Sequence, residues 1–92
     1  MNIKIENIQC GIKSVLVSVH DVEPYMTISH LIRVFWNKMK EYMNDSEYWD
    51  SIDISLIDFC DSNFYLYDKT KTVEYYGLKD NDKIVVLNPF DN

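Results

Sequence analysis

One amphipathic segment constrains the fold of this chain more than any other feature. Thr27 stands before it as a candidate N-cap, because its hydroxyl can accept a hydrogen bond from a free amide of the first turn. We therefore expect a helix from about Ile28 to Tyr42 or Met43. Its apolar residues recur at spacings of three and four, the pattern of a helix with one buried face: Ile28, Leu31, Ile32, Phe35, Met39, Tyr42 and Met43.

The segments on either side of this helix have the patterns of strands. Residues 2–9 alternate polar and apolar side chains, and residues 14–20 form a β-branched run. The turn residues Cys10 and Gly11 lie between them, so the two segments predict a hairpin. The later part of the chain predicts, in order, a strand over 52–60, a short strand over 64–67, a helical turn over 72–77, a tight turn over 79–82 and a last strand over 84–87.

A single helix has to cover all of these strands, which requires a mixed sheet wrapped around it. The first and last strands can pair in parallel, because the chain between them is long enough for the crossover that parallel pairing needs. We therefore expect an α+β fold of the β-grasp type, with a mixed four- to five-stranded sheet around one main helix. A length of 92 residues suits one domain, so residues 1–92 are taken as a single unit.

Two stretches of the sequence resemble ubiquitin and its relatives. In the later stretch, a turn of acidic and basic residues ends in Thr72 and is followed by Val73, Tyr76 and Leu78 at that family's spacing. The earlier stretch, residues 17–35, resembles the family's second strand and helix start. The resemblance implies a ubiquitin-like fold in which the Tyr76 hydroxyl meets backbone groups of the turn formed by residues 68–72.

The end of the sequence departs from the family pattern. Ubiquitin-type modifiers end in a Gly-Gly tail that is activated for conjugation, whereas this sequence ends Leu87-Asn-Pro-Phe-Asp-Asn92 and has no glycine after Gly77. The resemblance is to a tailless member, for which we expect neither conjugation nor a sulfur-carrier role. The family's apolar recognition patch lies on its third and last strands, and the same comparison places Cys60 or Asp61 near the centre of that patch, beside Leu87.

Charge is distributed unevenly along the chain, with a formal total of −6. Residues 1–43 contain five basic and four acidic residues, a sum of +1, whereas residues 44–92 contain four basic and eleven acidic residues, a sum of −7. Between Asp45 and Asp61 there are six acidic residues and no basic one. This charge disfavours direct binding of nucleic acid and favours a basic protein partner. A solvated acidic face without a partner is the alternative interpretation.

The candidate binding residues come from this acidic segment, the helix and the last strand. Trp36 lies at the boundary of the helix's buried face, where core or rim is favoured over an exposed binding anchor. The predicted partner-binding residues are Glu47, Tyr48, Trp49, Asp50, Asp53, Trp36 and Leu87.

Catalytic and metal chemistry find little support in the sequence. His20 and His30 have no cysteine at a ligand-like spacing, and Gly11 and Gly77 stand alone rather than in a phosphate-binding loop. Cys60 has Asp58 and Asp61 beside it, and an acidic setting of this kind disfavours a nucleophilic thiolate. We expect no enzyme, no metal and no cofactor. The sequence also has no apolar stretch long enough to cross a membrane, and we expect a cytoplasmic protein with reduced thiols.

Three functions remain open at this stage. The first is a non-covalent protein-protein interaction module or adaptor of ubiquitin-like fold, present as a monomer or weak oligomer. The second is an accessory protein of a bacterial type VII secretion system, similar to its small ubiquitin-like components. The third is an acidic phage or viral inhibitor that mimics nucleic acid or blocks a basic partner.

Overall fold

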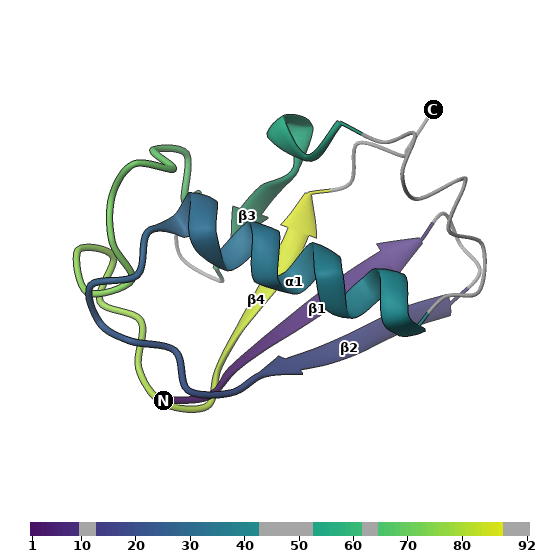
Figure 1. Cartoon of the computed structure of the whole chain (residues 1–92), viewed down its shortest axis with the longest axis horizontal. Helices are drawn as coiled ribbons and strands as arrows, with labels where there is room; N and C mark the ends of the chain where they lie inside the picture. Colours follow the sequence, from purple (N-terminus) through teal and green to yellow (C-terminus); the bar gives the residue numbers. More distant parts are fainter. Residues whose placement is uncertain (10–12, 43–52, 62–64, 88–92) are drawn as a thin grey trace.

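A mixed sheet and one long helix build the fold (Figure 1). The computed structural model describes residues 1–9, 13–42, 53–61 and 65–87. Within these ranges the sheet has four strands in the order β2-β1-β4-β3, and α1 crosses one of its faces. The elements are β1 (Ile3–Gln9), β2 (Lys13–Val19), α1 (Ile28–Tyr42), the short 3-10 helix η1 (Ile54–Leu56), β3 (Asp58–Cys60) and β4 (Asp82–Leu87).

The strand pairing confirms the expected topology. The hairpin of β1 and β2 is antiparallel and pairs Ile3 with Val19. The first and last strands are parallel neighbours in the centre of the sheet, where Ile3 lies opposite Asp82. On the other side of β4, β3 runs antiparallel to it. The result is the ubiquitin-like β-grasp arrangement with one helix that the sequence predicts.

The helix begins where the sequence predicts and is anchored at its N-terminus. Thr27 caps it, since its Oγ1 accepts a hydrogen bond of 3.1 Å from the His30 amide. The amides of Ile28 and Ser29 donate to the carbonyls of Lys71 and Lys69, at 2.9 and 3.0 Å. The free donors of the first turn are therefore used within the fold, and they tie α1 to the turn of residues 68–72.

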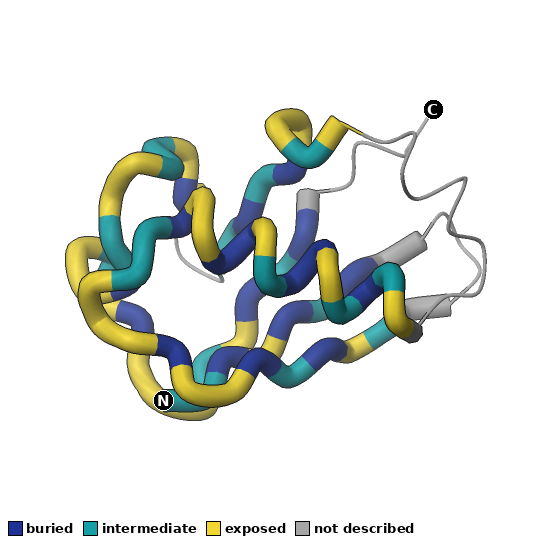
Figure 2. The backbone as a smooth tube through the Cα atoms, viewed as in Figure 1, coloured by how far each residue is buried: buried dark blue, intermediate teal, exposed yellow. Residues whose placement is uncertain are grey.

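The core lies between α1 and the sheet (Figure 2). The helix contributes its apolar stripe, and the strands contribute every second side chain. Trp36 is only 3% exposed and belongs to this core, so the core interpretation of that residue is confirmed. The largest fully buried side chains are those of Phe35, Phe59, Ile3, Ile5, Ile28, Leu31, Met39, Ile57, Leu66, Ile84 and Val19.

The strand predicted over residues 52–60 is wrong in its first half. Asp53 instead caps η1, and its carboxylate accepts from the amide and the hydroxyl of Ser55, at 3.0 and 2.7 Å. Such local bonds from short polar side chains compete with a strand ladder, because they satisfy the backbone without a neighbouring strand. Only Asp58–Cys60 forms β3.

The short strand predicted over residues 64–67 is also wrong within the part that the structure describes. Tyr65 makes an isolated bridge to Cys60, and the Leu66 amide donates to the Phe59 carbonyl at 3.0 Å. Burial of Leu66 in the core accounts for the apolar pattern that suggested a strand.

The turn of residues 68–72 is fixed by Tyr76, as the family resemblance implies. The Tyr76 hydroxyl accepts from the Asp68 amide at 2.9 Å and donates to the Asp68 carbonyl at 3.3 Å. Residues 73–77 follow as a turn that ends at Gly77, whose φ of 70° lies in the left-handed region that favours glycine. The tight turn predicted over 79–82 is present, with the Asp82 amide donating to the Lys79 carbonyl at 3.0 Å.

Candidate binding surface

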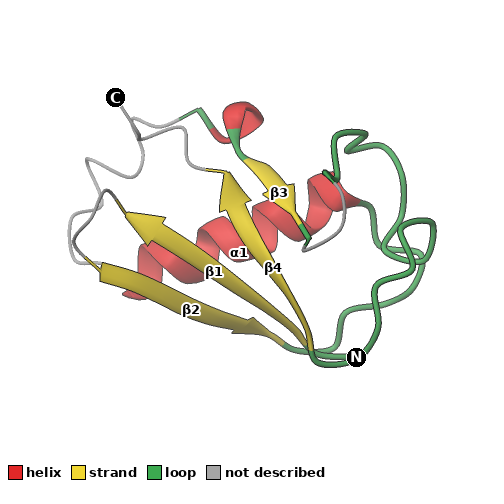
Figure 3. Cartoon of the chain, turned by 180° about the vertical axis from the view of Figure 1, so that it is seen from behind, coloured by secondary structure: helices red, strands yellow, loops and turns green. Residues whose placement is uncertain are grey.

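The sheet has one covered face and one face without a covering element among the described residues (Figure 3). Along β1, Ile3 and Ile5 are buried beneath α1, whereas Lys4 and Glu6 point the other way and keep contact with solvent. The same alternation continues along β4, where Ile84 is buried and Lys83 is exposed. The open face is therefore where a partner can reach side chains held by a rigid sheet.

One row of outward side chains crosses the whole open face. Glu6 lies opposite both Leu16 and Val85. Val85 in turn lies opposite Cys60, which bridges to Tyr65. Because side chains of paired residues share a face, the row runs from one edge of the sheet to the other in the order Leu16, Glu6, Val85, Cys60 and Tyr65.

An exposed aromatic pair lies at the β3 end of this row. The rings of Tyr65 and Tyr67 stack with their centroids 6.3 Å apart and their planes inclined by 7°. Tyr65 is 39% exposed and Tyr67 is 72% exposed. We call the patch formed by Asp58, Cys60, Tyr65, Tyr67 and Val85 the tyrosine surface.

The charge of Asp58 is matched within this surface. The Lys69 ammonium lies 3.0 Å from an Asp58 carboxylate oxygen, and it also donates to the Ser55 carbonyl at 2.7 Å. The Asp58 carboxylate accepts a hydrogen bond from the Tyr65 hydroxyl, which raises the pKa of Tyr65 because the bond favours the protonated phenol. With Asp58 paired to Lys69, the patch presents mainly aromatic and apolar groups.

Known proteins resemble this chain in fold rather than in sequence. No protein-family model matches it, and no curated protein does. Among solved structures, the ubiquitin-like domain of Arabidopsis thaliana protein At2g32350, in its solution NMR structure, has a TM-score of 0.57 at 20% identity, over 94% of this chain and 73% of that one. The fold is that of a ubiquitin-like domain. The crystal structure of the ubiquitin-like domain of Plasmodium falciparum Dsk2 agrees, with a TM-score of 0.53 at 20% identity over 94% of this chain and 96% of that one.

The ubiquitin-like fold brings together few of the predicted binding residues. Glu47, Tyr48, Trp49 and Asp50 lie outside the described residues. Asp53 is exposed, and its bonds to Ser55 lower the pKa of its carboxyl group. Trp36 was predicted as a binding residue, but its burial in the core removes it from any accessible surface of this structure.

The register corrects the predicted neighbourhood of Leu87. Its backbone pairs with Asp58, whereas Cys60 pairs with Val85. Along the β3–β4 ladder the Cys60–Val85 pair is followed by the Phe59–Val86 pair and then by the Asp58–Leu87 pair, so Leu87 lies two pairs away from Cys60.

Sequence reasoning missed the two tyrosines of the surface. Their spacing of two residues places both rings on one side of an extended chain, and this signal could have identified the pair. This spacing was not used because residues 64–67 were interpreted as an ordinary strand.

Metal and membrane features are absent from the part of the chain that the structure describes. No three His, Cys, Asp or Glu side chains of residues 1–9, 13–42, 53–61 and 65–87 gather as a metal-binding group. Over the same residues, no helix has the length and apolar character needed to cross a membrane.

Proposed function

We propose that this protein is a non-covalent protein-binding module whose partner docks on the tyrosine surface. The stacked and exposed rings of Tyr65 and Tyr67 carry this proposal, because a monomer gains little from leaving two large rings in water. Aromatic side chains bring large contact areas at a low entropic cost and dominate many protein interfaces. In this function the chain is not conjugated, performs no catalysis, needs no cofactor and works in the cytoplasm.

The position of the surface supports the proposal. The resemblance to ubiquitin implies a recognition patch on the third and last strands, and the tyrosine surface lies on β3, on β4 and on the segment bridged to β3. Cys60, Tyr65 and Tyr67 give this patch its own composition. A partner of ordinary ubiquitin is therefore not the expected ligand.

Charge indicates the chemistry of the partner. The strands β3 and β4 belong to residues 44–92, the part of the chain with a sum of −7. Lys69 already pairs with Asp58, so the acidic excess of this part of the chain comes from residues other than Asp58. We expect a partner with an apolar centre for the rings and basic residues around it.

The test compares two equally exposed tyrosines. The partner is first captured from the source cells with the wild-type chain, identified and purified, and its affinity is then measured by calorimetry. Tyr67→Ser should weaken binding by about 30-fold or more, the loss typical of a central aromatic contact. Tyr25→Ser is the matched control, because Tyr25 is 74% exposed but lies in the loop before α1, outside the tyrosine surface.

Three outcomes decide the matter. Binding that survives Tyr67→Ser unchanged contradicts the proposal. Binding that is lost with Asp53→Lys but kept with Tyr67→Ser assigns the partner to the acidic segment instead. Affinity that collapses between low and moderate salt favours a mimic of nucleic acid, whereas the aromatic contact should depend little on salt.

A further inference from the structure

The strand β2 forms a free edge of the sheet. In the order β2-β1-β4-β3, β1 occupies one side of β2, and no strand of the described residues pairs with the other side. An edge strand presents a row of backbone donors and acceptors that another strand can use. Whether another strand pairs with this edge depends on features that block pairing, such as charges, prolines and bulges, and on the amino-acid sequence of β2.

This edge lacks the usual protection against strand pairing. The single charged residue of β2 is Lys13 at its start, and from Ser14 to Val19 the strand has no charged residue, proline or glycine. The register with β1 is continuous from the Ile3–Val19 pair to the Gln9–Lys13 pair, without a bulge. Monomeric proteins generally interrupt an exposed edge with one of these features, so β2 is prepared for a further strand.

The sequence of β2 is the same in both directions around Leu16. It runs Ser14-Val15-Leu16-Val17-Ser18. If two such strands pair antiparallel about a two-fold axis at Leu16, then Leu16 meets Leu16 of the second copy, each Val15 meets a Val17, and each Ser14 meets a Ser18. Apolar pairs such as Leu16–Leu16 and Val15–Val17 stabilise a sheet, and no like charges meet within the palindrome.

We propose that two copies of this chain associate through β2 to form a symmetric dimer with one continuous sheet. The interface is isologous, since the same strand serves both copies. It lies at the edge opposite β3, so it leaves the tyrosine surface of each copy free. The dimer does not depend on the proposed partner binding.

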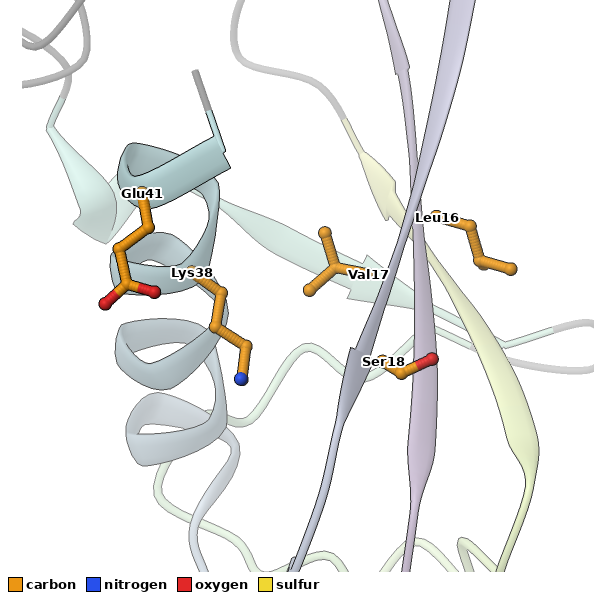
Figure 4. Close-up of a pocket in the computed structure, with 5 residues that line it drawn as sticks. All are labelled: Leu16, Val17, Ser18, Lys38 and Glu41. Atoms are coloured by element: carbon orange, nitrogen blue, oxygen red, sulfur yellow. The ribbon is translucent and has the colours of Figure 1, made fainter. Parts of the chain in front are cut away.

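The groove beside β2 supports this arrangement (Figure 4). A cavity of about 320 Å³ lies between β2 and α1, lined by Leu16, Val17, Ser18, Lys38 and Glu41. Figure 4 shows Val17 pointing toward the helix, Leu16 pointing away from it, and the Lys38 ammonium reaching toward the strand side of the groove. In the described residues, neither Lys38 nor Glu41 has an ion pair.

A two-fold axis through the Leu16 pair places the Lys38 and Glu41 side chains of both copies on the same face of the joined sheet. The axis is perpendicular to the joined sheet. The two α1 helices therefore lie on the same face of this sheet and run antiparallel to each other. Lys38 and Glu41 line the groove at the level of the palindrome.

The overall charge also favours this edge for self-association. Residues 1–43, which contain β1, β2 and α1, sum to +1, whereas residues 44–92 sum to −7. Two copies that meet through β2 bring their nearly neutral parts together and keep their acidic parts apart.

Sedimentation equilibrium of the full chain over a wide concentration range tests the dimer. The wild type should show a reversible monomer–dimer equilibrium. Leu16→Lys should raise the dissociation constant by about tenfold or more, because it places two like charges opposite each other. Leu56→Lys is the matched control: Leu56 is 61% exposed and Leu16 is 54% exposed, but Leu56 lies on η1, away from β2.

A disulfide test fixes the register. In a chain with Cys10→Ser and Cys60→Ser, Leu16→Cys should form a covalent dimer with oxidised glutathione as the oxidant, because opposite Cα atoms on antiparallel strands lie within disulfide range. Ser18→Cys should not, since the two copies of residue 18 are offset by four residues, about 13 Å along the strand.

Several results would overturn the dimer. A wild type that stays monomeric at every concentration contradicts the proposal. The proposal is equally wrong if the chain does not self-associate and β2 pairs instead with a strand of another protein. The proposal is also contradicted if Leu16→Lys and Leu56→Lys weaken the dimer equally, or if cysteines at positions 16 and 18 crosslink to the same extent. Circular dichroism of each variant confirms that the monomer remains folded.

Discussion

The ring of Phe35 meets the ring of Phe59 edge to face, with centroids 5.8 Å apart and planes inclined by 79°. Phe35 lies in the middle of α1, and Phe59 is the central residue of β3. Both are fully buried. This pair joins the helix directly to a strand of only three residues at the edge of the sheet, so it helps to hold the strand that supports the tyrosine surface.

Truncation of Phe35 should therefore be severe. Phe35→Ala should lower the free energy of unfolding by about 3–5 kcal/mol, as core phenylalanine truncations do, or unfold the domain. Urea denaturation measures the loss. With Phe59→Ala in a double-mutant cycle, a coupling of about 0.5–1.5 kcal/mol is expected for the ring contact. A Phe35→Ala chain of wild-type stability would contradict the packing described here.

Removal of the Tyr76 hydroxyl tests the anchor of the 68–72 turn. Tyr76→Phe should cost about 1–3 kcal/mol, because the partly buried Asp68 amide loses its acceptor. Tyr75→Phe serves as the control, since the Tyr75 hydroxyl has no hydrogen bond within the described residues and its ring contacts remain. Equal stability changes in the two variants would show that the hydroxyl contributes nothing.

Asn7 offers a stabilising substitution. Its side chain is fully buried, and among the described residues neither its amide nitrogen nor its oxygen has a hydrogen-bond partner. Asn7→Leu removes these unsatisfied groups and keeps a side chain with the same number and branching of heavy atoms, so it should raise the free energy of unfolding by about 1–3 kcal/mol. Asn7→Asp should lower it, because a charge would then be buried. Thermal and urea unfolding of the two variants should give shifts of opposite sign.

The pKa of Tyr65 makes part of the stability dependent on alkaline pH. The hydrogen bond to Asp58 raises the pKa of Tyr65 above the ordinary value of 10.0 in the folded state. The contribution of this hydrogen bond to the stability of the fold is therefore fully present below the pKa of Tyr65 in the unfolded chain. It is lost as the pH rises through the higher pKa of Tyr65 in the folded state. In an NMR titration, Asp58→Asn should lower the pKa of Tyr65 toward 10.0. No change in that variant would contradict the Tyr65–Asp58 bond.

The helices and strands whose apolar residues recur with a regular period were predictable from the sequence. The elements that are determined by tertiary contacts were not. The stripe from Ile28 through Phe35 to Met39 predicts α1 with its true start, since Thr27 supplies a local cap. The alternation of residues 2–9 predicts β1 in the same way. Residues 52–60 contain enough isoleucine and leucine to suggest one long strand, but Asp53 and Ser55 close a local turn that outweighs this tendency.

The candidate surface was harder to predict than the fold. Its position depends on the register between β3 and β4, which places Cys60 beside Val85. It also depends on a bridge from Cys60 to Tyr65, outside any regular strand. Neither contact has a local signature in the sequence. Trp36 illustrates the opposite error, because a large aromatic residue near the edge of a helical stripe can be a core residue as well as an anchor.

The parallel neighbours β1 and β4 have a consequence for biosynthesis. Of the four strands of the described sheet, β4 is translated after the others, and it enters the middle of the sheet, between β1 and β3. A nascent chain can form its hairpin and helix early, but the ribosome must release residues 82–87 before β3 gains its neighbour in the sheet. Until then the apolar underside of α1 stays partly uncovered, so the growing polypeptide needs protection from aggregation until residues 82–87 have left the ribosome.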